Sequence, residues 1–281
     1  MTLTLVGLGL GAIQDITLRG LEAIKAADRV FLEIYTSALI DSSREELESF
    51  FGKPVIEADR ISVEDQAEHI IQEARDKHVV LLVAGDPLSA TTHCDLCMRA
   101  EHAGVQVDVI HNASIINAIG RTGLQLYRFG EVVSIPLFEK NWTPDSFYDK
   151  IAKNRRANLH TLCLLDIKVK ERSVENLMAN RMIFEPPRYM TVNVAIEQIQ
   201  HVDAAKHEVD ASTRAFGVAR LGSKTAQIVA GTLEQLKSVD FGAPLHSLVI
   251  CAPELHDIEE QYYQHYHCEK GRAQSQPKHS T

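Results

Sequence analysis

The chain has 281 residues, of which 45% are hydrophobic and 24% are charged. This composition supplies enough apolar material for one large domain or two smaller ones, and it excludes a disordered or fibrous chain. The 29 basic residues are outnumbered by 38 acidic residues, which gives a net charge of −9 with histidine neutral. A protein that follows a phosphate backbone normally carries the opposite charge, so we expect no direct contact with nucleic acid.

The longest apolar run extends from Leu5 to Ile13 and is far shorter than the roughly 18 residues that cross a bilayer. No Lys or Arg precedes the run, as a signal peptide would require, so we interpret it as a buried strand and its exit loop. The 5 cysteines are few and odd in number, which favours a reducing compartment over a disulfide framework. We therefore expect a cytoplasmic protein without a membrane span.

Residues 1–111 alternate apolar runs with amphipathic segments, a pattern typical of a doubly wound α/β domain. The predicted strands are 3–6, 29–32, 79–84 and 105–110, and the predicted helices are 15–27 and 63–75. The run Val79–Ala84 is apolar throughout, as expected of a strand that is buried on both faces of a parallel sheet.

The pattern changes after His111, where uneven helical connections separate the strands and predict a mixed sheet. The candidate strands of this part are 131–135, 160–165, 214–221 and 245–251. We therefore predict an N-terminal α/β domain at 1–111 and a C-terminal α/β domain at 112–267. Residues 268–281 lack periodic apolar positions and are predicted to form a solvated, flexible tail.

Gly7, Gly9 and Ala12 match the letters of a dinucleotide-binding fingerprint, and Glu33 ends the next predicted strand. In that fingerprint the helix opens within the glycines, so that its amides face a pyrophosphate. Here the best helix cap, Asp15, lies beyond the glycines. The segment predicts either a loop that lets a ligand approach the strand end closely or a simple tight connection. A nicotinamide dehydrogenase is the alternative that rests on these letters.

The loop Gly85-Asp86-Pro87 ends the strand at 79–84 and continues into small hydroxylated residues. Ligands of open α/β sheets bind beyond the carboxyl ends of strands, so the loop is a candidate ligand contact. The alternative is that Asp86-Pro87 is turn chemistry and that Thr92 caps a helix.

Three further motifs each allow a structural and a functional interpretation. Ser114 caps a short helix or reaches a ligand at the domain joint, and His246 opens a late strand, where a lone histidine is usually structural. The C-x-x-C of Cys94 and Cys97 has no second pair, so two small residues one helical turn apart explain it better than a zinc or redox site. The metal-like His265–Cys268 borders the tail, and no metal site is predicted.

Several segments share their residues and their order along the chain with one enzyme family. They are Gly7-Leu-Gly-Leu-Gly11 with Asp15-Ile-Thr17, Gly85-Asp-Pro87 with Ala90-Thr-Thr-His93, His111-Asn-Ala-Ser-Ile115, Cys163-Leu-Leu-Asp-Ile-Lys168, Glu185-Pro-Pro-Arg-Tyr-Met190, Ala219-Arg-Leu-Gly222 and Pro244-Leu-His-Ser-Leu248. Together they closely resemble the diphthine synthases, which belong to the tetrapyrrole methylase-like superfamily. The resemblance extends from about Leu3 to Leu255 and leaves out only the C-terminal tail.

This resemblance implies two α/β domains, with a mostly parallel N-terminal sheet, a mixed C-terminal sheet and S-adenosyl-L-methionine in the cleft between them. It implies a methyltransferase, usually a homodimer, that acts on translation elongation factor 2. In that family the amine of a 3-amino-3-carboxypropyl group on a histidine is methylated to the trimethylammonium form. Leu124–Gly130 and the tail look more like the eukaryotic members, which also form a methyl ester on the carboxylate.

Matched motif by motif, the resemblance implies these cofactor contacts: Leu10, Asp86, Ser89, Ser114, Ile115, Leu165, Leu221 and His246. The apolar members would wall the cofactor while backbone groups bind its edges, and Asp86 and Ser89 would meet its charged end. Leu88 departs from the aromatic residue that is frequent in the family, which changes the packing of this loop.

Methyl transfer from a sulfonium needs positioning and desolvation of the reactants more than a dedicated base. No general base is assigned, and His246 and Asp86 rank as cofactor contacts rather than proton acceptors. A methyltransferase for a small tetrapyrrole is the alternative within the same fold. A module that docks a basic partner through its acidic surface is the non-enzymatic alternative.

Overall fold

The computed structural model describes residues 1–37, 42–172, 174–179 and 181–269. The chain divides into two compact units, neither of which is continuous in sequence. Unit 1 consists of Met1–Ala118, Ile167–Arg188 and Gly222–Lys224, and unit 2 of Ile119–Asp166, Tyr189–Leu221 and Thr225–Thr281. The predicted boundary between residues 111 and 112 stays a prediction, and most of the predicted tail, 270–281, lies outside the described residues.

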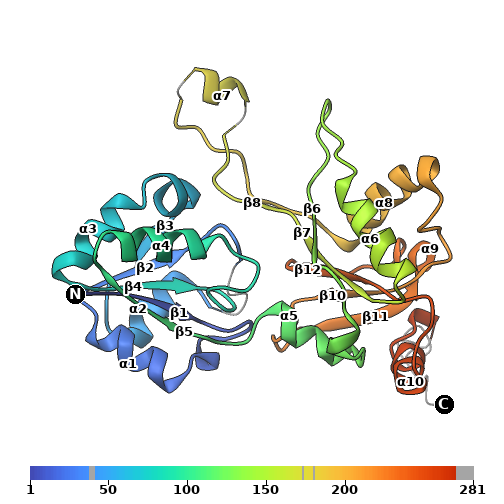
Figure 1. The fold of residues 1–281 in the computed structure, drawn as a ribbon, viewed down its shortest axis with the longest axis horizontal. Helices are drawn as coiled ribbons and strands as arrows, with labels where there is room; N and C mark the ends of the chain where they lie inside the picture. The colour runs from blue at the N-terminus through green and yellow to red at the C-terminus, as the bar shows by residue number, and fades with distance from the viewer. Residues whose placement is uncertain (38–41, 173, 180, 270–281) are drawn as a thin grey trace, which may run out of the picture. The chain divides into compact units, whose positions relative to one another are not determined.

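Unit 1 is built on a parallel sheet with the strand order β3-β2-β4-β1-β5 (Figure 1). Its strands are β1 (Thr2–Gly7), β2 (Arg29–Glu33), β3 (Ile56–Ala58), β4 (His78–Val83) and β5 (Gln106–Ile110). Every residue from Val79 to Val83 is fully buried, which agrees with the apolar run of a strand covered on both faces. The four strands predicted for this part are confirmed, and β3 was not predicted.

Helices cover both faces of this sheet and bury separate clusters of apolar side chains. On one face α3 (Glu68–Asp76) and α4 (His93–His102) supply Ile70 and Leu96 to the core. On the other face α1 (Leu18–Ala26) and α2 (Arg44–Phe51) supply Ile24 and Leu47. This is the doubly wound arrangement that the alternating pattern predicts. The short helix α5 (Ile115–Ala118) follows β5.

Two predicted helices begin later than expected. Asp15 was predicted to cap the first helix, but the cap is Thr17, whose Oγ1 accepts a hydrogen bond from the Gly20 amide at 3.0 Å. Asp15 instead ends a 3-10 turn. The helix predicted at 63–75 is interrupted, because a π turn at Ile61–Asp65 precedes α3.

Unit 2 contains a mixed sheet with the order β11-β10-β12-β7-β6. Its strands are β6 (Val133–Ile135), β7 (Thr161–Leu165), β10 (Arg214–Ala219), β11 (Gln227–Thr232) and β12 (His246–Ile250). Only β6 and β7 are parallel, and the other neighbours are antiparallel. The predicted mixed sheet is confirmed, although the edge strand β11 was not predicted.

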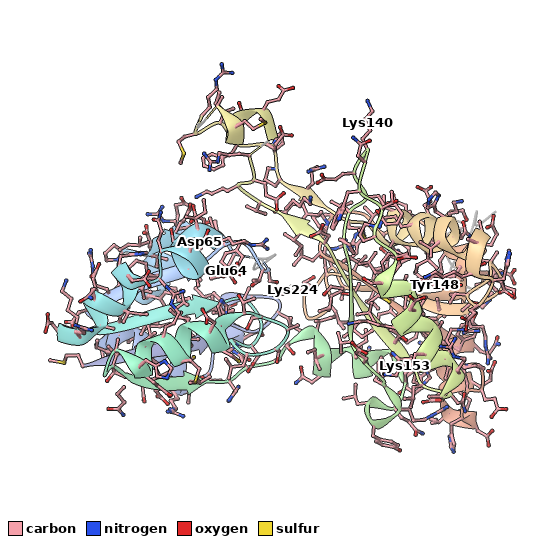
Figure 2. The ribbon with its side chains drawn as sticks, turned by 45° about the horizontal axis from the view of Figure 1, so that its top comes forward. Glu64, Asp65, Lys140, Tyr148, Lys153 and Lys224 are labelled. Atoms are coloured by element: carbon pink, nitrogen blue, oxygen red, sulfur yellow. The ribbon has the colours of Figure 1, made fainter. Side chains whose placement is uncertain are left out.

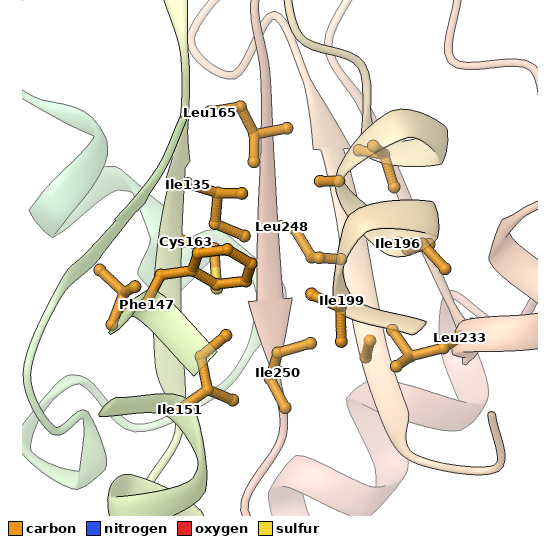
Figure 3. Close-up of a cluster of buried hydrophobic side chains, with 14 of the residues drawn as sticks. Ile135, Phe147, Ile151, Cys163, Leu165, Ile196, Ile199, Leu233, Leu248 and Ile250 are labelled. Atoms are coloured by element: carbon orange, nitrogen blue, oxygen red, sulfur yellow. The ribbon is translucent and has the colours of Figure 1, made fainter. Parts of the chain in front are cut away.

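The core of unit 2 lies between its sheet and the helices α6 (Ser146–Arg156), α8 (Val192–Lys206) and α9 (Leu233–Leu236). Figure 3 shows Phe147 and Ile151 of α6 and Ile196 of α8 beside strand residues such as Leu248. Tyr148, labelled on α6 in Figure 2, is also buried, and its hydroxyl accepts hydrogen bonds from the Glu208 and Val209 amides at 2.9 Å.

The remaining elements are β8 (Ile167–Lys168) and β9 (Arg188–Tyr189), which pair with each other, α7 (Val174–Met178) and α10 (Asp257–His265). Among the described residues, no helix is long and apolar enough to span a membrane.

A buried ion-pair network fixes α10 in unit 2. Glu259 is fully buried, and its Oε1 accepts a hydrogen bond from the Gln125 amide at 3.0 Å. Its Oε2 accepts one from the His256 amide at 2.8 Å and one from the Arg128 guanidinium. Burial alone would raise the pKa of Glu259, but the Gln125 and His256 amides and His160 lower it, so the carboxylate is charged.

His160 completes this network as a neutral side chain. Its Nδ1 accepts a hydrogen bond from the Ala252 amide at 3.0 Å, so its proton lies on Nε2, 3.1 Å from Glu259. Burial lowers the pKa of His160 below its ordinary value of 6.5, and it outweighs the attraction of Glu259.

We expect the free energy of unfolding to fall as the pH drops below about 6.5, because the unfolded chain then binds a proton at His160 that the folded chain does not. Urea unfolding between pH about 7.5 and about 5.5 measures this slope. A His160→Gln variant should have a shallower slope, whereas a variant of the exposed His102 should keep it. A flat or rising stability over this range would contradict the assignment.

Candidate functional site

Three loops of unit 1 meet at one edge of its sheet, because they follow the adjacent parallel strands β4, β1 and β5. The first two are joined directly: the Gly9 amide donates to the Gly85 carbonyl at 3.2 Å, and the Gly85 amide donates to the Gly9 carbonyl at 2.7 Å. Such an edge is where open α/β sheets bind their ligands.

The glycines of the first loop are required by close contacts. A Cβ on Gly7 would lie 2.7 Å from the Gly85 carbonyl oxygen and 2.8 Å from Cβ of Asn112. Gly9 has a φ of 80°, which side chains rarely tolerate. Asp15 holds the end of the loop, because its Oδ2 accepts the Gly11 amide at 3.0 Å and the Ala12 amide at 3.1 Å. No helix therefore opens within the glycines, which removes the structural basis of the dinucleotide fingerprint.

Asp86 joins the second loop to the third. Its Oδ1 accepts hydrogen bonds from the Leu88 amide at 3.0 Å and the Ser89 hydroxyl at 3.1 Å. Its Oδ2 accepts His111 Nδ1 at 2.7 Å and the Asn112 amide at 3.1 Å. Burial would raise the pKa of Asp86, but these four donors lower it, so the carboxylate is charged and already surrounded by donors. The predicted turn chemistry of Asp86 is confirmed.

Of the two helix caps predicted near this edge, the one at Ser114 is confirmed and the one at Thr92 is not. Ser114 caps α5, because its Oγ accepts the Ile116 amide at 3.2 Å and its own amide donates to Asn117 Oδ1 at 2.8 Å. Thr92 makes no such cap: its hydroxyl donates to Glu64 at 2.7 Å.

Five of the eight predicted cofactor contacts belong to unit 1: Leu10, Asp86, Ser89 and Ser114 lie on these three loops, and Ile115 begins α5. Leu10 is half-buried, and a Cβ on Gly222 would come within 2.6 Å of its Cβ. Gly222 is therefore another position where only glycine leaves room.

The other three predicted contacts lie at one end of the sheet of unit 2. Leu165 ends β7, His246 begins the neighbouring strand β12, and Leu221 follows β10 on its other side. The register pairs Ala219 with His246 and Leu164 with Ser247. Leu165, His246 and Leu221 therefore lie on or just after adjacent strands, at the same end of the sheet. All three are at least nine-tenths buried.

His246 has both ring nitrogens engaged. Nε2 donates to the Ala243 carbonyl at 3.0 Å, and Nδ1 accepts the Val192 amide at the start of α8 at 3.4 Å. Burial lowers the pKa of His246, and this effect outweighs the opposing influence of the Ala243 and Gly242 carbonyls. The ring is neutral and fixed, which confirms the predicted structural role of His246.

Arg220 positions the loop before β12 and was missed by sequence reasoning. Its guanidinium donates to the Phe241 carbonyl at 2.8 Å, to the Ala243 carbonyl and to Thr225 Oγ1 at 3.1 Å. Because Ala243 is also the partner of His246, Arg220 helps fix that histidine. Its place beside Leu221 in the Ala219–Gly222 segment was the only signal for it in the sequence.

Cys94 and Cys97 lie on α4, one exposed and one half-buried, as the helical interpretation predicts. Within the described ranges, no three His, Cys, Asp or Glu side chains are grouped so that they could hold a metal ion.

Comparison with known proteins identifies the family. A family model for Tetrapyrrole (Corrin/Porphyrin) Methylases matches residues 2–237. A probable diphthine methyl ester synthase of Arabidopsis thaliana is 53% identical over 279 residues, which cover 96% of this chain and 99% of that protein. The chain belongs to the diphthine synthase family of tetrapyrrole methylases.

Other members of the family agree with this assignment. The diphthine methyl ester synthase of Homo sapiens is 48% identical over 280 residues. The matched residues cover 98% of this chain and 98% of that protein. A crystal structure of a diphthine synthase superposes with a TM-score of 0.82 at 37% identity, covering 96% of this chain and 98% of that one. The two-domain α/β fold of the diphthine synthases is confirmed, and the chain is a methyltransferase rather than a dehydrogenase.

Proposed function

We propose that this diphthine synthase transfers methyl groups from S-adenosyl-L-methionine to the 3-amino-3-carboxypropyl-histidine of translation elongation factor 2. The product would be the trimethylated amine together with a methyl ester on the carboxylate. The observation that carries the proposal is the identity of about half of all residues over nearly the whole chain to proteins named diphthine methyl ester synthase.

We propose that the eight predicted residues contact the cofactor. The residues fit such a group chemically. In the loop that follows β4, Gly85 has a φ of 81° and no atom within 3.9 Å of where a Cβ would lie, so a ligand can approach the backbone there. Leu10, Ile115, Leu165 and Leu221 supply the apolar surface that most small-molecule sites present, beside few polar groups.

When bound, the cofactor supplies the methyl group as an electrophilic sulfonium, and the chain binds, orients and desolvates the reactants. Neither Asp86 nor His246 is free to take a proton. The Asp86 carboxylate accepts four hydrogen bonds and has a lowered pKa, and both nitrogens of His246 are occupied. The substrate amine would therefore lose one proton to solvent before each of its methylations, and methylation of the carboxylate needs no loss of a proton.

We propose further that the chain acts in the cytoplasm as a homodimer and does not touch nucleic acid directly. The support for the last point is the net charge of −9, which suits contact with a protein better than contact with a phosphate backbone. Light scattering of the purified chain tests the dimer.

The proposed function is tested by reaction of the purified chain with S-adenosyl-L-methionine and elongation factor 2 that carries the amino-carboxypropyl group. We expect transfer to this protein and none to a porphyrinoid. Methylation of the porphyrinoid alone would favour the tetrapyrrole alternative, and binding to the factor without turnover would favour a docking module.

A further inference from the structure

A second concave surface of unit 1 lies at the carboxyl ends of β2 and β3, on the same edge of the sheet as the three loops. We call it the β2–β3 groove. It has a volume of about 260 Å³. Its wall and floor include Tyr35, Asp59, Arg60, Ile61, Val169 and Arg172.

The far wall of the groove is the segment after β8, and an ion pair attaches it to β3. Nζ of Lys170 lies 2.9 Å from Oε2 of Glu57, in the middle of β3. The neighbouring Glu171 lies 3.7 Å from Lys168 and accepts the Glu185 amide at its carbonyl. The charges of Lys170 and Glu171 are thus balanced by chain partners, and Arg60 lies 4.0 Å from Glu64, whereas Arg172 has no acidic partner among the described residues.

Asp59 presents a negative charge to the groove. Its Oδ1 accepts both the amide and the hydroxyl of Ser62, at 2.9 and 2.8 Å. Burial raises the pKa of Asp59, but the Ser62 hydrogen bonds and the charge of Lys170 lower it by more than burial raises it. The carboxylate therefore stays ionised.

The two arginines present positive charge to the same groove. Arg172 makes no ion pair within the described part of the chain, and its polar contact there is a weak one, 3.6 Å from the sulfur of Met182. Arg60 lies over the ring of Tyr35, 5.3 Å from its centroid, and 4.0 Å from Glu64, which Figure 2 labels on unit 1. A guanidinium with free donors is the side chain best suited to grip a carboxylate.

Tyr35 adds an unused polar group to the wall. The side chain is 3% exposed, and its hydroxyl completes no hydrogen bond with a described residue. Burial and the charges of Glu33 and Glu64 raise its pKa and outweigh the lowering influence of the nearby Thr92 hydroxyl and of Arg60, so it keeps its proton. Buried hydroxyls are nearly always hydrogen-bonded, which marks this one as a position for a ligand or a water.

We propose that the β2–β3 groove binds an α-amino acid group, with Arg172 at its carboxylate and Asp59 at its amine. This inference rests on the proposed function, and the occupant is the 3-amino-3-carboxypropyl end of the protein substrate. A volume of about 260 Å³ is below the roughly 300–1,000 Å³ of sites for drug-sized ligands, and it suits this short group better than a tetrapyrrole.

The methionine end of the cofactor carries the same amino acid chemistry. We assign the groove to the substrate because the predicted cofactor contacts of unit 1 follow β1, β4 and β5, whereas the groove follows β2 and β3. Asp59 attracts an ammonium and a trimethylammonium alike, because attraction by charge needs no N–H group. Ester formation removes the charge that Arg172 binds and so favours release of the finished product.

The test compares Arg172→Gln and Asp59→Asn with Arg181→Gln, a matched change of charge outside the groove. Asn keeps an oxygen for Ser62 while it removes the charge. We expect each groove variant to raise the KM for modified elongation factor 2 by roughly tenfold. Affinity for S-adenosylhomocysteine, and for elongation factor 2 that lacks the amino-carboxypropyl group, should stay at the wild-type value, and Arg181→Gln should change nothing.

The other outcomes overturn the inference in distinguishable ways. A loss of S-adenosylhomocysteine affinity in the groove variants would assign the groove to the cofactor. An equal loss of affinity for the unmodified factor would make the groove a general docking surface for protein, and an unchanged KM would remove it from binding altogether. If the wild-type chain failed to methylate the factor, the proposed function would fail instead.

Discussion

Replacement of Glu259 by alanine is expected to lower the free energy of unfolding by about 3–5 kcal/mol, the cost of breaking a buried ion pair from one side. The fully buried carboxylate serves two backbone amides, the Arg128 guanidinium and His160. Its removal leaves the partly buried Arg128 without its carboxylate partner and frees the first turn of α10.

Urea unfolding of the two proteins measures the effect. Glu260→Ala is the matched control, because the neighbouring carboxylate is partly exposed and pairs with Arg214 at 2.7 Å. That change should cost about 1 kcal/mol or less. A loss in the Glu259 variant no larger than that of the control would contradict a structural role for the network.

Replacement of Asp86 by alanine is expected to weaken the binding of S-adenosylhomocysteine at least roughly tenfold while the chain stays folded. The carboxylate joins the loops after β4 and β5 through one side chain: it holds Leu88 and Ser89 on one and His111 and Asn112 on the other. Without it the loops lose their fixed spacing, and a stability cost of about 1–3 kcal/mol accompanies the loss.

Calorimetric titration with S-adenosylhomocysteine, together with thermal unfolding, separates the two effects. Asp95→Ala on α4 is a suitable control, since this exposed carboxylate pairs only at 3.4 Å with Arg99. If the folded Asp86 variant bound the cofactor product as well as the wild type, the loops that follow β4 and β5 would not form the site.

Most strands were predictable because burial on both faces leaves a continuous apolar run, as in Val79–Val83. β11 was missed for the opposite reason: it is an edge strand, Gln227–Thr232, and four of its six residues are only partly buried. The assignment of Ile167–Arg188 to unit 1 depends on tertiary contacts such as Lys170 with Glu57, which leave no local pattern in the sequence.

The helix starts were harder to predict because two residues compete for each. Both Asp15 and Thr17 are good caps, and the choice was decided by the Gly11 and Ala12 amides, which take up the Asp15 carboxylate. The same limit applies to Thr92, whose hydroxyl binds Glu64 from another segment.

The position of the site on unit 1 could be predicted from the rule that ligands bind at the carboxyl ends of parallel strands. The sequence also supplied the loop residues themselves through the family resemblance. It did not supply their partners: the contacts of Asp86 with His111 and of Arg220 with the loop before His246 join residues that are distant in the chain. The β2–β3 groove was likewise absent from every motif, because three separate segments form it.

The most direct measurement of the central claim is mass spectrometry of elongation factor 2 after reaction with this chain and S-adenosyl-L-methionine. We expect the modified histidine peptide to gain four methyl groups, one of which mild alkaline hydrolysis removes as an ester. A gain of three stable methyl groups would contradict ester formation, and an unmethylated peptide would contradict the proposed function.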